Sequence, residues 1–68
     1  MTNQHDADLQ DEIRVLVNDQ ILQLAKKLSI NLAEAERIVK EEAGIHSMTQ
    51  RFFDEDIARF NCVMDKYL

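Results

Sequence analysis

Residues 8–44 of the chain read DLQDEIRVLVNDQILQLAKKLSINLAEAERIVKEEAG. Apolar residues recur in this stretch at spacings of three and four, which is the period of one face of an α-helix. The pattern breaks at Ser29–Asn31, and Asn31 followed by Glu34 is a capping-box sequence that starts a second helix. Gly44, the one glycine of the chain, then ends that helix because glycine adopts the left-handed conformation without strain. We expect the first helix to run from about Asp8 to Leu28.

The first helix carries more apolar side chains than one stripe toward a core requires. Its stripe consists of Leu9, Ile13, Leu16, Val17, Ile21, Leu24 and Leu28. Val15 and Leu22 project roughly opposite this stripe, and their spacing of seven residues places them on a common line. This surplus indicates a second interface.

A third helix is predicted from Ser47, because Ser47 followed by Gln50 is another capping-box pattern, and it can run to about Tyr67. Its apolar stripe consists of Phe53, Ile57, Phe60, Met64 and Tyr67. The stripe is widened to almost half of the helix surface by Met48, Phe52 and Val63. One neighbouring helix does not cover a stripe of that width.

These patterns predict an all-α fold, a small three-helix unit in the order long, short, long, with the first and third helices about 20 residues each and roughly antiparallel. Residues 1–7 are expected to be a frayed tail and residues 8–68 a single domain. A domain of this size buries only about 60% of its unfolded surface, and Cys62 is the only cysteine, so no internal disulfide supports it. We therefore expect the helices to associate as a homodimer. The expected interface residues are Val15, Leu22, Met48, Phe52 and Val63.

Gln20 and Asp56 are polar residues on apolar faces. Each either lies at the margin of its stripe and turns toward water, or hydrogen-bonds to the other or across a dimer and fixes the register. Asp56 is flanked by phenylalanines, where an unpaired carboxylate is costly.

Residues 21–40 have the outline of a helix-turn-helix, with a small residue at Ala25, a short turn, and Ala35 and Ile38 facing inward. Direct readout of DNA needs base-edge donors and phosphate contacts from Lys and Arg. The outward face of the second helix instead carries Ala33, Glu34, Glu36, Arg37, Lys40 and Glu41. DNA binding is therefore not expected, and a helix-turn-helix transcriptional regulator is the alternative function.

Residue types that catalyse reactions or bind metals are not grouped in the sequence. His5 and His46 lack the neighbouring His or Cys residues of a metal site. The carboxylates of residues 54–56 diverge by about 100° per residue on a helix and do not converge on one substrate. Cys62 has no histidine at helical reach to activate its thiol. We expect no enzyme activity, metal, cofactor or small-molecule substrate.

The composition is acidic, with 13 Asp and Glu against eight Lys and Arg and a net charge of −5, which repels phosphate and favours solubility or cationic partners. The single cysteine and the lack of a leader-like segment or a long uncharged apolar run predict a cytoplasmic protein without membrane contact. A protein that imitates DNA would also be acidic, but this sequence lacks the long rows of acidic residues that such imitation requires. The apolar surplus remains, and it predicts a non-catalytic protein–protein interaction or regulatory adaptor protein that acts through helical surfaces.

Overall fold

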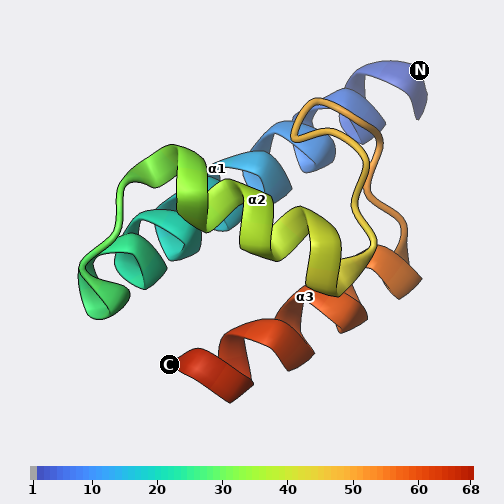
Figure 1. Ribbon diagram of the computed structural model, residues 1–68. Helices are drawn as coiled ribbons and strands as arrows, with labels where there is room; N and C mark the ends of the chain where they lie inside the picture. The colour runs from blue at the N-terminus through green and yellow to red at the C-terminus, as the bar shows by residue number, and fades with distance from the viewer. Residues whose placement is uncertain (1) are drawn as a thin grey trace.

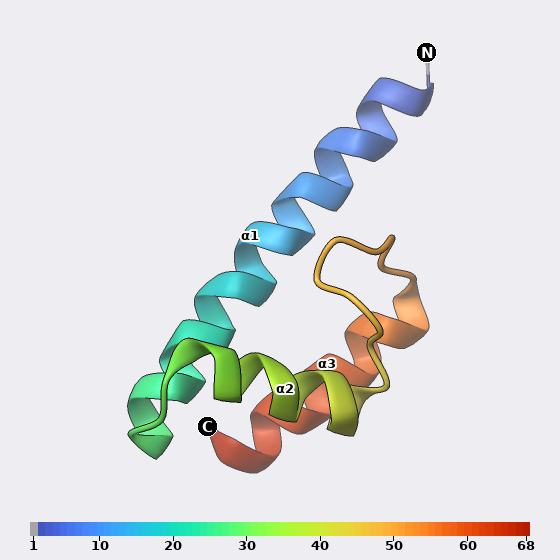
Figure 2. The same ribbon diagram turned by 45° about the horizontal axis from the view of Figure 1, so that its top comes forward.

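The computed structural model describes residues 2–68 of the chain, and the side chains of residues 7–68. It contains three α-helices, α1 (Thr2–Leu28), α2 (Leu32–Ala43) and α3 (Asp54–Tyr67), and no strand in this described part (Figure 1). The predicted all-α three-helix fold is confirmed. The molecule measures 43 × 18 × 18 Å, and its long dimension follows α1 (Figure 2).

The first helix begins at Thr2, six residues before the predicted start at Asp8. Residues 2–7 contain neither proline nor glycine, so nothing in their backbone stops the helix from continuing toward the N-terminus. Met1 lies outside the described residues, and the fraying of residues 1–7 stays a prediction.

The turn between α1 and α2 confirms the predicted break at Ser29–Asn31. Ser29 adopts a left-handed conformation with φ 56°. Its N–H donates to the carbonyl of Lys26 at 3.3 Å, and the N–H of Ile30 donates to the carbonyl of Ala25 at 3.0 Å. These two bonds satisfy carbonyls that the end of a helix leaves without partners.

Both predicted ends of α2 are present. The side chain of Asn31 accepts a hydrogen bond from the Glu34 N–H at 2.8 Å. The carboxylate of Glu34 pairs with Arg37 at 2.9 Å and not with the cap, so only half of the predicted capping box forms. Gly44 ends the helix with φ 68° and ψ 32°, and its N–H donates to the carbonyl of Lys40.

The third helix begins at Asp54, so the predicted start at Ser47 is wrong. The side-chain oxygen of Gln50 accepts from the N–H groups of His46 and Ser47, at 3.0 and 3.3 Å, and this arrangement closes a turn within the segment between α2 and α3. α3 therefore has 14 residues, and the order is one long helix followed by two shorter ones.

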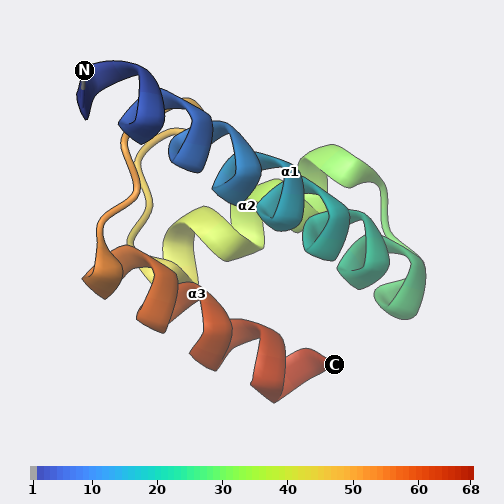
Figure 3. The same ribbon diagram turned by 180° about the vertical axis from the view of Figure 1, so that it is seen from behind.

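The expectation that the first and third helices are antiparallel is also wrong. α1 and α3 run in the same general direction, and α2 runs back between them (Figures 1 and 3). The segment after α2 carries the chain back to the N-terminal half of α1, where the side chain of Gln10 bonds the backbone of Phe52. α2 contacts both other helices more extensively than they contact each other.

The core lies where the three helices meet, and α2 determines which face of α1 it uses. The buried apolar residues are Val17, Ile21, Leu24, Ala25, Ala35, Val39, Ala43, Ile45, Phe52, Phe60, Val63 and Met64. Because α2 packs on the side of α1 that carries Ile21 and Ala25, the members of the predicted stripe on its other edge, Leu9 and Leu16, are exposed. Leu28, in the last turn, is exposed as well.

Phe52 and Phe53 exchange the places that the sequence predicts for them. Phe52 is buried, whereas Phe53 is 61% exposed. The centroid of the Phe53 ring lies 5.6 Å from the Arg51 guanidinium carbon. The reason is the late start of α3: Phe53 has an extended backbone, with φ −97° and ψ 168°, and side chains alternate along an extended chain.

Candidate functional site

Exposed apolar side chains are concentrated on α1. Val15 is 66% exposed, Leu16 is 64% exposed and Leu22 is 43% exposed after the core has formed. Val15 and Leu22 were predicted at an interface, and they are the two predicted interface residues that the structure leaves open to solvent. Leu16 was expected in the core.

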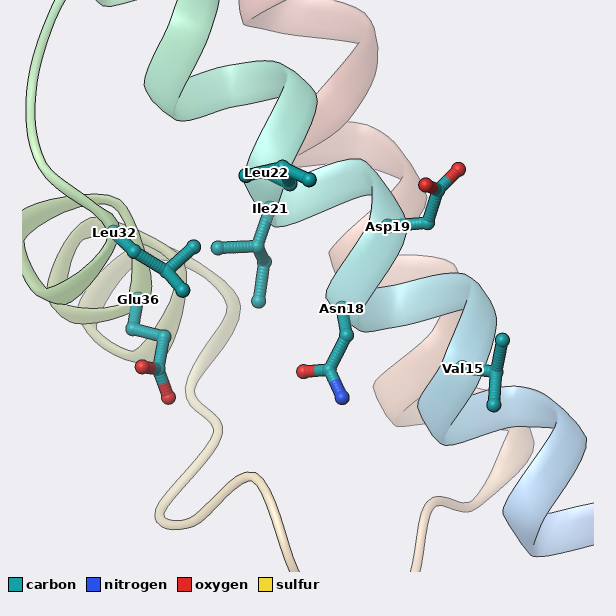
Figure 4. A pocket seen from close by; sticks show the side chains of 7 residues that line it. All are labelled: Val15, Asn18, Asp19, Ile21, Leu22, Leu32 and Glu36. Atoms are coloured by element: carbon teal, nitrogen blue, oxygen red, sulfur yellow. The ribbon is translucent and has the colours of Figure 1, made fainter.

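Val15 and Leu22 border a hollow of about 540 Å³ between α1 and the beginning of α2. Figure 4 shows Ile21 and Leu32 pointing toward one another across it, with α3 behind α1 as seen from this side. The lining residues are Val15, Asn18, Asp19, Ile21, Leu22, Leu32 and Glu36. We call this surface the Val15–Leu22 face. It presents leucine and valine side chains with a polar rim, which is the composition of a protein-binding surface.

A smaller hollow of about 220 Å³ separates α1 from α3. Its lining residues are Ile13, Leu16, Val17, Gln20, Phe52, Ile57, Phe60 and Asn61. Gln20 is half-buried here, at the margin of the apolar surface. Among the described residues it makes no hydrogen bond to Asp56, so the alternative in which these two side chains bond to each other within one chain is not realised.

The rim of the Val15–Leu22 face is mainly acidic. Asp11 pairs with Arg14 at 3.1 Å, and Asp19 accepts a hydrogen bond from the Gln23 side chain at 3.2 Å. Glu12 and Lys26 are exposed on the same side of α1. The charges therefore change from negative to positive toward the C-terminal end of α1.

The other three predicted interface residues belong mainly to the core of the single chain. Phe52 is 3% exposed and Val63 is 6% exposed, and Met48 is partly buried against the same core. Met48 and Phe52 belong to the segment before α3, which returns to the N-terminal half of α1, and Val63 is one of the buried residues of α3. Of the five predicted interface residues, the surface open to solvent is therefore mainly that of Val15 and Leu22.

Asp56 is buried at 8% exposure, so it does not turn toward water, and both of its carboxylate oxygens have partners within the chain. Its carboxylate accepts from the Phe53 N–H at 2.9 Å, which caps α3, and from the Arg59 guanidinium. Arg59 also donates through Nε to the carbonyl of Ala43 at 2.8 Å. The Asp56–Arg59 pair therefore joins the C-terminal end of α2, where the helix dipole is negative, to the N-terminal end of α3. This role is structural.

Gln10 is a buried polar residue that the sequence reasoning missed. Its side-chain Nε2 donates to the Phe52 carbonyl at 2.9 Å, and its Oε1 accepts from the Phe52 N–H at 2.8 Å. One amide thus satisfies both backbone groups of a buried residue. Its position in the sequence could have indicated its burial, because Gln10 lies seven residues before Val17 and therefore on the same face of the helix as this core residue.

A polar cluster joins α2 to the end of α3. The hydroxyl of Tyr67 and the ammonium of Lys66 both donate to the Glu42 carboxylate, the latter at 3.0 Å. These hydrogen bonds, that from Tyr67 first, lower the pKa of Glu42. The bond to Glu42 is likewise the main cause that raises the pKa of Tyr67 and that of Lys66.

Within residues 7–68, no three His, Cys, Asp or Glu side chains lie close enough together to hold a metal ion. Cys62 is a free, exposed thiol. None of the helices in the described part is long and apolar enough to span a membrane. Comparison of the chain with protein-family models, curated proteins and solved structures finds no match.

Proposed function

We propose that this protein is a small non-catalytic interaction protein of the regulatory or adaptor kind, that it acts in the cytoplasm, and that it forms a homodimer through the Val15–Leu22 face. One observation carries the proposal: two large apolar side chains on one line of α1 remain exposed after the core has formed. Burying apolar surface against a partner contributes a free energy of about 25 cal/mol for each Å² that is removed from water. Leu32 of α2 extends the same surface.

A three-helix chain of 68 residues also gains from such association, because its own core is small. Any partner that binds only the folded chain shifts the equilibrium away from the unfolded chain. The proposed dimer therefore contributes to the stability of the fold as well as to its function.

Sedimentation equilibrium tests the proposal on the wild-type chain and on the double variant Val15→Glu/Leu22→Glu. We expect the wild type to dimerise at concentrations on the order of 10–1000 µM, because a face of one helix is smaller than a standard interface. The variant should be monomeric and should keep its helical circular dichroism, since both side chains are exposed. A matched control is Leu9→Glu/Leu68→Glu, which places the same two charges at exposed leucines elsewhere. A monomeric wild type, or equal loss in both variants, would contradict the proposal.

The alternative is a helix-turn-helix regulator of transcription that uses residues 21–40. The observation in its favour is the close packing of α1 on α2, where Ala25 and Ala35 are both buried. Against it, the Arg37 guanidinium on the outward face of α2 is paired with Glu34.

Fluorescence anisotropy with mixed-sequence duplex DNA at low salt decides between the two functions. A DNA-binding domain retains a non-specific affinity of about 10⁻⁴–10⁻⁶ M that falls steeply with salt. We expect no such binding. Binding that disappears in Arg37→Ala/Lys40→Ala would establish the alternative instead.

A further inference from the structure

Three exposed charges follow one another along α1 beside Val15 and Leu22. They are Glu12, Asp19 and Lys26, spaced seven residues apart. Residues seven apart on a helix differ by only about 20° around its axis, so the three side chains form one line. Val15 and Leu22, also seven apart, form a second line next to it. The charged line reads acid, acid, base from the N-terminal to the C-terminal end of α1.

The Val15–Leu22 face is open to another helix. α3 packs on the opposite side of α1, where Ile13 and Val17 line the hollow shared with Ile57. Figure 4 shows the same arrangement, with α3 behind α1. α2 borders the face along one edge only, through Leu32 and Glu36.

We infer that a second copy of this chain covers the Val15–Leu22 face, with the two α1 helices side by side and antiparallel. The inference rests on the proposed function and adds the orientation and register of the pair. Val15 and Leu22 lie equally far from the midpoint between Asn18 and Asp19. A two-fold axis at this midpoint therefore places Val15 of each copy against Leu22 of the other, as an isologous interface requires.

The line of charges favours the antiparallel orientation over the parallel one. In an in-register parallel pair that packs through Val15 and Leu22, the charged lines of the two copies lie on opposite sides of the contact, so Glu12 and Lys26 do not meet. In the antiparallel pair, Glu12 of each copy faces Lys26 of the other, and only Asp19 meets its own copy. The flexible stem of Lys26 accommodates a displacement of one residue, about 1.5 Å along the helix. The attraction between Glu12 and Lys26, which the in-register parallel pair lacks, therefore selects the antiparallel orientation.

Charge exchange at Glu12 and Lys26 tests the register. Each single variant, Glu12→Lys or Lys26→Glu, turns two attractive contacts per dimer into repulsive ones, so sedimentation equilibrium should show dimerisation weakened on the order of tenfold. The double variant Glu12→Lys/Lys26→Glu should return to the wild-type affinity, because the exchanged charges attract again. Asp65→Lys is the control for Glu12→Lys: it changes the net charge equally, at an exposed position of α3, and should bind almost as the wild type does.

Asp19→Asn provides an independent test. In the antiparallel dimer this change removes the one contact between like charges, so dimerisation should become severalfold tighter. If the face instead receives a cationic segment of another protein, the same change removes an attractive charge and cannot tighten self-association.

The outcomes separate the pairing from the proposed function. If Val15→Glu/Leu22→Glu dissociates the dimer but the double exchange at Glu12 and Lys26 fails to restore affinity, the antiparallel register is overturned and the proposed function stands. If the chain is monomeric throughout the concentration range, or if its dimer is insensitive to Val15 and Leu22, the proposed function fails as well.

Discussion

Ser29 and Gly44 have left-handed backbones and mark the ends of α1 and α2. Substitutions at the two positions are expected to change stability in opposite directions. Gly44→Ala should lower the stability of the fold by about 1 kcal/mol, because a side chain at positive φ is strained. A Cβ at this position meets only Arg59 Nε, at 3.7 Å, which is an ordinary contact, so the loss comes from the backbone. Ser29→Gly is the matched variant at φ 56°, and it should leave stability unchanged or raise it. Urea denaturation measures both. An unchanged midpoint in Gly44→Ala would contradict the left-handed end of α2.

Tyr67 offers a direct measure of the cluster at Glu42, because it is the only tyrosine of a chain without tryptophan. Its hydrogen bond to Glu42 raises its pKa above the ordinary value of 10.0, so the ultraviolet titration of the phenol should have a midpoint above that value. Glu42→Ala should bring the midpoint back toward 10.0. The same midpoint in both proteins would mean that the bond is absent in solution.

The cluster also gives stability a pH dependence with a definite sign. The folded pKa of Tyr67 is raised, so its contribution is present below the unfolded pKa and is lost as the pH rises through the folded pKa. The pKa of Glu42 is lowered, so its contribution is present above the unfolded pKa and is lost as the pH falls through the folded value. Tyr67→Phe should reduce both dependences.

At the level of the helices, the beginning of α3 depends on Asp56. Asp56→Ala should destabilise the fold by about 1–3 kcal/mol, since it leaves the Phe53 N–H and the Arg59 guanidinium without their acceptor. Asp54→Ala, an exposed acid in the same turn, is the control and should cost less. Thermal unfolding followed by circular dichroism compares them. Equal losses would show that only the charge at the helix end matters.

The helices also show how far the sequence alone leads. Local chemistry predicts the ends of α2, because Asn31 and Gly44 act within a few residues of themselves. The segment before α3 is held by the hydrogen bonds between Gln10 and Phe52, which are 42 residues apart, and no local pattern predicts these bonds. Ser47 and Gln50 have the residue types of a helix start, yet they close a turn in a segment that Gln10 holds in place.

The same limit applies to the candidate surface. Val15 and Leu22 could be identified because they depart from a periodic pattern on one helix. Phe52 and Val63 look equally superfluous in sequence, but the path of the chain after α2 places them in the core. Which apolar side chains remain exposed depends on how three helices pack, and that packing is set by contacts between distant residues.

α1 contributes to two surfaces of the molecule at once. One side of α1 packs on α2 and α3, and another side carries the Val15–Leu22 face. The long dimension of the molecule, 43 Å, follows α1, so a second copy can lie along this helix. Val15 and Leu22 are exposed and project away from the core residues Val17 and Leu24, so changes at these two positions can alter association without disturbing the core.

The bond between Gln10 and Phe52 has a consequence for the rates of folding. α1 and α2 are joined by a short turn and can meet early, whereas Gln10 and Phe52 must close a loop across 42 residues. We expect this contact to form after the transition state, so Gln10→Ala should speed unfolding and leave the folding rate almost unchanged. Stopped-flow measurements in urea test this, with Gln23→Ala, an exposed glutamine of the same helix, as the control. Slower folding in Gln10→Ala would place the contact in the nucleus instead. On this view, one buried amide determines how long the native state lasts and has little influence on how quickly it is reached.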